Sequence, residues 1–336
     1  MLVAPARPDV AGKANENRVA AWGKSLRGHP LVGPALALLL LVIVFSFASD
    51  RFLTATNVSL VLQQTLVLGM LALGQTLIIL TAGVDLALGA ITVLATIIAA
   101  KVAVGGAPEG LALLLAFVLA IAASTLNGLL AARVRLPPFI VTLGAFTVLT
   151  AVSYLLSGSR SQTIPKGLLT FLGQGFSIGG VFISWGIPTL LAAYALFAHI
   201  LGNTAWGKHI YAVGDNPDAA RLAGVRVERT LIGVYAVAGL LYAVGAWLSL
   251  GRIPSADPNA MANIALQSIT AVVLGGTSFF GGRGKVLGTL TGALIVGVLR
   301  NGLTLAGIDS LFQDIITGIL IVATVSLDQY SRRKSN

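Results

Sequence analysis

The feature that most constrains this chain is a series of long apolar runs that contain few charged residues. Only 10% of the residues are charged, whereas soluble domains carry about 25%. A helix that crosses a bilayer needs about 20 mostly apolar residues. The sequence therefore predicts an all-α polytopic membrane protein with about ten transmembrane helices. These predicted spans are 31–49, 58–80, 87–104, 111–132, 138–157, 185–202, 230–250, 262–280, 286–304 and 310–327.

The positions of Lys and Arg predict how the spans are oriented. The net charge is +10, and most basic residues lie in residues 1–30, in the internal loops and after residue 328. An even number of spans places these segments on one side, and basic residues favour the cytoplasmic side. We therefore expect both termini in the cytoplasm, with a basic tail at 1–30, a membrane domain at 31–328 and a short tail at 329–336. Membrane topology accounts for the charge, so we expect membrane lipid and no nucleic acid as a partner.

Two pairs of similar segments predict an internal repeat. The first pair is 127–144 (NGLLAARVRLPPFIVTLG) and 301–318 (NGLTLAGIDSLFQDIITG). The second is 83–95 (GVDLALGAITVLA) and 256–273 (ADPNAMANIALQSITAVV). The separation corresponds to five spans, which reverses the orientation of the second copy. We therefore expect an inverted repeat that relates spans 2–5 to spans 7–10, as in many transporters.

Asp85 is a carboxylate within a long apolar stretch, between Gly83 and Gly89. A charge at the centre of a membrane helix costs about 2.5–3.5 kcal/mol on insertion scales. The glycines permit a helix break, and Asp is a favourable N-cap residue for the helix that follows. Two compatible roles stay open: Asp85 caps a restarted helix near the cytoplasmic face, or it belongs to a pathway through the membrane. Asn127 and Asn301, at the start of the repeated segments, are the other helix-break or pathway candidates.

The most charged internal loop, 203–229, contains one short predicted helix of about seven residues. Asn216 suits the N-cap, Pro217 the first helical position and Gly224 the stop. A helix of this length cannot span a bilayer. Its small and apolar residues favour docking to a cytoplasmic partner, and the alternative is an ordinary loop. The residues singled out are Asp215, Asn216, Pro217, Asp218, Ala219, Arg221, Leu222 and Gly224.

The sequence offers little support for catalysis or metal binding. It has no Cys, its three His are scattered, and no Ser/His/Asp set or carboxylate pair suggests hydrolysis. Residues 202–209 (GNTAWGKH) begin like a phosphate-binding loop. However, His209 stands where that motif needs Ser or Thr, and no strand precedes it. We therefore expect no enzyme activity, no metal and no cofactor bound by this chain.

Four stretches in the same order resemble one known family. They are LGQTLIILTAGVDLALGAI, PPFIVTLGAF, GKHIYAVGDNPDAARLAGVRVERT and ITAVVLGGTSFFGGRGKVLGTLTGALIVGVLRNGLTLAGI. Over roughly residues 50–328, the chain is similar to the membrane permease subunits of ribose-, xylose- and arabinose-type ABC sugar importers. The resemblance implies ten spans with an inverted repeat in the bacterial inner membrane.

The same resemblance implies three partners. These are a second permease copy, an ABC ATPase (usually with tandem domains) that holds ATP and Mg, and a periplasmic sugar-binding protein. By position, 216–224 corresponds to the helix that couples ATP hydrolysis to the gate, and Asp85 to the acidic signature. The chain departs from the family at Ala82 (more often Gly or Ser), Ala87 (more often Ser) and Thr150–Ala151 (often Arg-Gly). These departures leave the identity of the sugar open.

Other functions remain compatible with the sequence. A stand-alone secondary transporter would need intramembrane ionisable residues, and Asp85, Arg300 and Asp314 are the few available. A membrane scaffold would need no transported solute. Within the ABC permeases, another small solute such as a branched-chain amino acid is the alternative substrate.

Overall fold

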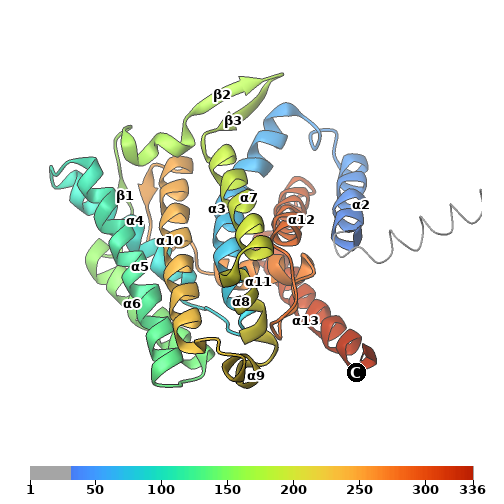
Figure 1. Cartoon of the computed structure of the whole chain (residues 1–336). Helices are drawn as coiled ribbons and strands as arrows, with labels where there is room; N and C mark the ends of the chain where they lie inside the picture. Colours follow the sequence, from blue (N-terminus) through green and yellow to red (C-terminus); the bar gives the residue numbers. More distant parts are fainter. Residues whose placement is uncertain (1–31, 336) are drawn as a thin grey trace, which may run out of the picture.

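The computed structural model describes residues 32–335, which form a helical bundle with four short strands (Figure 1). The predicted basic tail at 1–30 lies outside the described residues. The helices are α2 (Val32–Ala48), α3 (Ala55–Leu80), α4 (Leu88–Val104), α5 (Glu109–Arg133), α6 (Pro138–Ser157), the 3-10 helix η1 (Leu168–Gly173), α7 (Gly186–Asn203), α8 (Ala205–Asp215), α9 (Pro217–Leu222), α10 (Val227–Arg252), α11 (Ile264–Leu274), α12 (Val286–Leu305) and α13 (Ser310–Ser335). The strands are β1 (Gln162–Thr163), β2 (Gly175–Ile178), β3 (Val181–Ser184) and β4 (Ser255–Ala256).

Ten of the described helices coincide with the ten predicted apolar segments. Six of them, α3, α5, α6, α7, α10 and α12, are long and apolar enough to cross a membrane. The other four, α2, α4, α11 and the first part of α13, are apolar but shorter. The prediction of a mostly helical polytopic membrane protein is confirmed. The count of ten complete spans stays a prediction, because a membrane helix normally needs about 20 residues.

The structure corrects the predicted span at 262–280. Helix α11 ends at Leu274, and residues 275–285 form a turn instead of more helix. Gly276, Gly281 and Gly282 in this turn have positive φ angles, which glycine adopts readily and which do not continue a right-handed helix. The eleven residues of α11 extend only about 16 Å at 1.5 Å per residue.

The segment between the predicted spans 138–157 and 185–202 contains strands that the sequence did not predict. β2 and β3 form an antiparallel hairpin in which Gly175 pairs with Ser184. Gly179 and Gly180 occupy its two-residue turn with positive φ, as hairpin turns of this length require. β1 pairs with β4, antiparallel. The prediction of an all-α fold is therefore corrected: the structure is mostly helical but also contains two small antiparallel strand pairs. At the other end of the chain, α13 continues through the predicted tail as far as Ser335.

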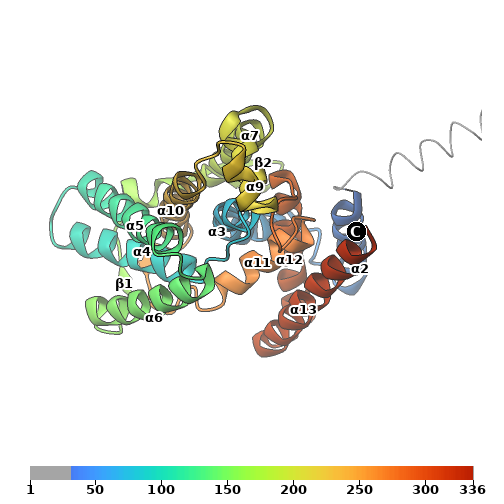
Figure 2. The same cartoon turned by 60° about the horizontal axis from the view of Figure 1, so that its bottom comes forward.

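Helix α3 lies at the centre of the bundle, with α4, α5 and α6 on one side and α11, α12, α13 and α2 on the other (Figure 2). Of its most apolar 18-residue window, 83% is buried, as expected for a helix that is apolar around its whole circumference. Glycines let α10 approach α3 and α5 closely. A Cβ at Gly74 would lie 2.7 Å from the Tyr242 ring, and one at Gly128 would lie 2.6 Å from Tyr235 Cβ.

Candidate functional site

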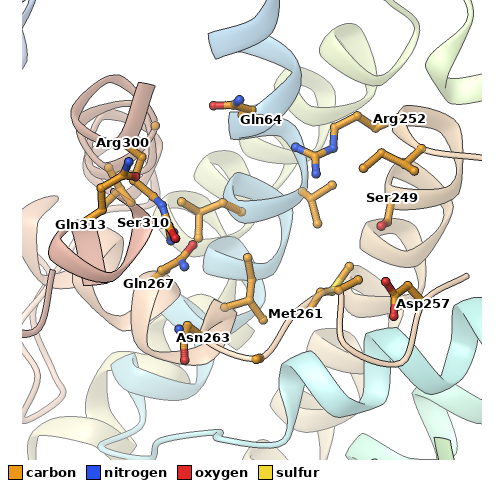
Figure 3. Close-up of a pocket in the computed structure, with 18 of the residues that line it drawn as sticks. Gln64, Ser249, Arg252, Asp257, Met261, Asn263, Gln267, Arg300, Ser310 and Gln313 are labelled. Carbon is orange, nitrogen blue, oxygen red and sulfur yellow. The ribbon is translucent and has the colours of Figure 1, made fainter. Parts of the chain in front are cut away.

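A cavity of about 750 Å³ opens between α3, α10, α11, α12 and α13, which is within the size range of small-molecule sites. Figure 3 shows Gln267, Arg300 and Gln313 on one side of it and Ser249, Arg252 and Asp257 on the other. Apolar side chains, including those of Val67, Leu68 and Val296, complete the lining. Helix α3, through Gln64, and the four consecutive helices α10 to α13 therefore each bring a polar side chain to one space.

One side of the cavity is held by an ion pair. Arg300 Nη2 lies 3.3 Å from Asp314 Oδ1, and Asn263 Nδ2 donates to Asp314 Oδ2 at 2.9 Å. The carboxylate of Asp314 thus connects α12, α13 and the loop before α11. Because Arg300 and Asp314 are paired, they contribute little net charge to the cavity.

Several polar side chains of the lining have no hydrogen-bond partner among the described residues, including those of Gln64, Ser249, Arg252 and Gln267. The two amides and the hydroxyl can each donate and accept, and the guanidinium of Arg252 offers only donors. A solute with several hydroxyl groups has the complementary chemistry, because each hydroxyl also donates and accepts. The apolar part of the lining would contact the carbon skeleton of such a solute.

Asp85 lies in a break between two helices, because α3 ends at Leu80 and α4 begins at Leu88. Asp85 is completely buried. Its Oδ1 accepts from the Ala87 amide at 2.8 Å, and its Oδ2 accepts from the Tyr242 hydroxyl at 3.1 Å. With its amide oriented to satisfy both groups, Gln75 donates to the Asp85 carbonyl and accepts from the Asp85 amide.

The N-cap assignment is corrected. Ala87 occupies the N-cap of α4 and makes no side-chain cap bond. Asp85 lies two residues earlier and satisfies the Ala87 amide in an Asx-type turn. The sequence provided no signal for Tyr242, which lies 157 residues away in an apolar helix. Ala82 has a φ of 61°, in the left-handed region that glycine adopts most readily.

The short helix predicted in the loop 203–229 is present as α9. Asn216 Oδ1 accepts from the amides of Asp218 and Ala219 at 3.0 and 2.9 Å. Pro217 is the first helical residue, and Gly224 follows the helix with a φ of 84°. Leu222 is 91% exposed. The cap and the exposed apolar side chain thus agree with the prediction, whereas the docking role of this helix stays a prediction.

The loop also contains α8, which the sequence analysis did not predict. The residues that resemble a phosphate-binding loop run from the end of α7 into α8, without the strand that such a loop requires. The end of α8 lies against the helix break: a Cβ at Gly214 would overlap the Leu80 carbonyl oxygen. The Gly282 amide donates to the same carbonyl at 3.0 Å. The loop 203–229, the helix break and the turn 275–285 therefore meet at one end of the bundle.

Tyr211 of α8 reinforces this junction. Its hydroxyl donates to the Gly284 carbonyl at 2.9 Å. Burial raises the pKa of Tyr211, because the phenolate would lose hydration. The phenol therefore stays protonated at neutral pH and keeps its hydrogen to donate.

The other predicted pathway residues lie in helix contacts. Asn301 and Asn57 form two reciprocal amide hydrogen bonds, at 2.8 and 2.9 Å, between α12 and α3. Asn127 is buried in α5, and Gly89 packs against Met261 and Ile264. None of the five predicted residues (Gly83, Asp85, Gly89, Asn127 and Asn301) is part of the cavity lining. The signal that could have found the lining was single polar residues, such as glutamine, within apolar segments.

Comparison with known proteins gives a consistent result. Residues 57–325 match the family described as "Branched-chain amino acid transport system / permease component". The chain is 41% identical to the fructose import permease protein FrcC of Rhizobium meliloti, over 92% of this chain and 88% of that protein. It is 38% identical to the ribose import permease protein RbsC of Bacillus subtilis, over 90% and 93%. It is 36% identical to the galactose/methyl galactoside import permease protein MglC of Escherichia coli, over 90% and 95%. No solved structure matches the chain.

Proposed function

This chain belongs to the family of transport-system permease components described above, and on that premise we propose that it is the membrane permease subunit of an ABC importer for a monosaccharide. The cavity, with unpartnered polar side chains such as those of Gln64, Arg252 and Gln267, is the observation that carries this proposal. The cavity would hold the sugar during alternating access, while a separate ATPase supplies the energy. Arg252, Gln64 and Gln267 would bind the hydroxyl groups of the sugar.

The cavity favours a sugar over a branched-chain amino acid. An amino acid carries an ammonium group, which needs a free carboxylate. Asp257 lines the cavity, but its Oδ1 accepts from the Asn259 amide at 2.8 Å, so only its Oδ2 would be left to hold the ammonium group. Asp314 is held by Arg300 and Asn263. The relatives named for fructose, ribose and galactose support the same choice.

The proposed assembly contains two permease copies, a tandem-domain ABC ATPase that holds ATP and Mg, and a periplasmic sugar-binding protein. In this proposal the chain lies in the bacterial inner membrane with both termini and α9 in the cytoplasm. The ATPase would contact α9, and its closure would reach the membrane domain through α8. Support for this route comes from the end of α8, which touches Leu80 at the helix break and the turn 275–285.

We also propose ten spans in two inverted halves, α3–α6 and α10–α13. Helix packing supports this arrangement. α4 contacts α5 and α6, and in the second half α11 contacts α12 and α13. Across the halves, α10 packs on α5 as α3 packs on α12. A contact in one half thus has its counterpart in the other, as a two-fold repeat requires.

Uptake into proteoliposomes tests the function. The permease is reconstituted with its ATPase and binding protein, and uptake of labelled pentoses, hexoses and leucine is measured with and without ATP. We expect ATP-dependent uptake of a sugar. Gln64→Leu should slow it roughly 2- to 10-fold, because a neutral hydrogen bond contributes about 0.5–1.5 kcal/mol. Gln63→Leu, on the same helix but outside the lining, is the matched control. Uptake of leucine but no sugar, or uptake that needs no ATPase, would overturn the proposal.

The coupling role of α9 has its own test. Ala219 and Leu222 are both exposed, so Ala219→Trp and Leu222→Asp should leave the fold intact but disturb a docked partner. We expect both variants to reach the membrane, to co-purify with less ATPase and to lose uptake. Ala205→Trp places the same bulk at an exposed position of α8 and serves as the control. Normal ATPase binding and uptake in both α9 variants would assign the coupling role to another segment.

A further inference from the structure

A second cavity, of about 320 Å³, lies between α8 and the start of α10. It is distinct from the larger cavity and shares no residue with it. Its volume is at the lower end of the range for small-molecule sites. The lining consists of Trp206, His209, Gly224, Arg226, Arg229 and Thr230.

The side chains around this cavity offer mostly hydrogen-bond donors. Arg226 and Arg229 are exposed, and neither forms an ion pair among the described residues. Trp206 lies beside α10, and its indole nitrogen would be 3.7 Å from a Cβ at Gly233; it has no acceptor within the described part of the chain. The nearby carboxylate of Glu228 is exposed and outside the lining. Two guanidinium groups without a carboxylate between them suit an anionic ligand, and phosphate in particular.

The cavity lies where the membrane helices end. α7 finishes at Asn203 and α10 starts at Val227, so Trp206 and Arg229 lie within a turn of these two ends. Trp is enriched at this interfacial level of membrane proteins. The bias of basic residues toward the cytoplasm explains the presence of the arginines, but not their grouping around a cavity with a free indole N–H. In addition, the positive end of the α10 dipole opposes cations in its first turn, so helix formation does not account for them either.

We propose that this cavity binds the phosphate head of an anionic phospholipid from the cytoplasmic leaflet. The proposal rests on the proposed orientation, with the loop 203–229 in the cytoplasm, but not on the identity of the transported solute. Basic pockets beside membrane helices on this side bind such headgroups. The two arginines hold the phosphate, and the Trp206 N–H donates to one of its oxygens. A bound lipid would thereby connect α8 to α10 beside the coupling helix.

Binding of short-chain phosphatidylglycerol to the purified full-length permease tests this site. Each basic residue near an anionic headgroup contributes about a fivefold factor, so Arg226→Gln/Arg229→Gln should weaken binding by about thirtyfold. Arg226→Lys/Arg229→Lys should retain most of the affinity, and Trp206→Phe should lose a smaller part. Lys208→Gln/Arg221→Gln removes the same charge from the same loop but outside the cavity, and it should change affinity less than threefold.

Competition experiments distinguish a lipid headgroup from a free anion, and comparison of the variants distinguishes both from a protein contact. Phosphatidylcholine should not compete, and inorganic phosphate should displace the lipid only weakly. Tight binding of inorganic phosphate alone would make the ligand a free anion and overturn the lipid proposal. If Arg226→Gln/Arg229→Gln and Lys208→Gln/Arg221→Gln lose lipid affinity equally, the effect depends on the net charge of the loop and not on the cavity, and the proposal is wrong. Retained lipid binding in Arg226→Gln/Arg229→Gln, together with loss of ATPase co-purification, would make the cavity a protein contact. Because lipid binding is measured without transport, failure here leaves the sugar permease proposal untouched.

Discussion

Replacing Asp85 distinguishes a structural carboxylate from a charge that acts in transport. In the structure, one carboxylate oxygen accepts from the Ala87 amide and the other from the Tyr242 hydroxyl. Asp85→Asn preserves both contacts, because the amide oxygen accepts from Ala87 and the amide nitrogen can donate to the Tyr242 oxygen. Only the charge and the direction of one hydrogen bond change. Asp85→Leu keeps the branched shape and the number of side-chain heavy atoms but removes both contacts.

The expected losses of folding free energy differ several-fold among Asp85→Leu, Tyr242→Phe and Asp85→Asn. A buried donor left without a partner costs about 1–3 kcal/mol. Asp85→Leu leaves two such donors, the Ala87 amide and the Tyr242 hydroxyl, so it should cost about 2–6 kcal/mol. Tyr242→Phe removes one hydrogen bond to a charged group, which contributes about 1.5–3 kcal/mol. Asp85→Asn keeps the bond count and should cost less than about 1 kcal/mol.

Thermal unfolding in detergent and uptake in proteoliposomes measure these effects together. We expect Asp85→Asn to unfold near the parent temperature and to transport, Tyr242→Phe to be intermediate, and Asp85→Leu to assemble poorly. If Asp85→Asn is as unstable as Asp85→Leu, the hydrogen-bond argument is wrong. If it folds normally but transports nothing, the charge itself acts in the pathway, which is the other role that the sequence left open.

The remaining predictions concern topology and helix packing. Single cysteines at Asn216 and Ser161 should behave oppositely toward an impermeant thiol reagent in intact cells, because the chain has no Cys of its own: Ser161→Cys should react and Asn216→Cys should not. The reverse pattern would invert the proposed orientation. Asn301→Leu should destabilise the bundle by about 1–3 kcal/mol, since it leaves the buried amide of Asn57 without its partner. In a double-mutant cycle with Asn57→Leu, the coupling should be about 0.6–1.7 kcal/mol, and a coupling near zero would show that the pair contributes no stability.

Local sequence was sufficient for the features that depend on near neighbours. Apolar length predicted where the ten helices lie, since a helix in lipid satisfies its own backbone and needs only a continuous apolar surface. Capping chemistry predicted α9 through Asn216, Pro217 and Gly224, because each acts within one turn of the helix. The break at Asp85 was likewise visible, because glycines flank a carboxylate. The resemblance to sugar permeases added the family, which the comparison with known proteins confirms.

Only the tertiary structure decided which polar residues meet. Gln64 and Gln267 are separated by about 200 positions, yet they line one cavity. Nothing in the sequence distinguishes them from other polar residues within apolar helices. Tyr242 reaches Asp85 because Gly74 lets α10 approach α3. Of the two asparagines at the start of the repeated segments, Asn301 forms hydrogen bonds between α12 and α3, and Asn127 is buried in α5. Periodicity and caps describe one segment at a time, whereas partners across a bundle depend on how closely helices pack and how they are rotated, and a single sequence does not encode these relations locally.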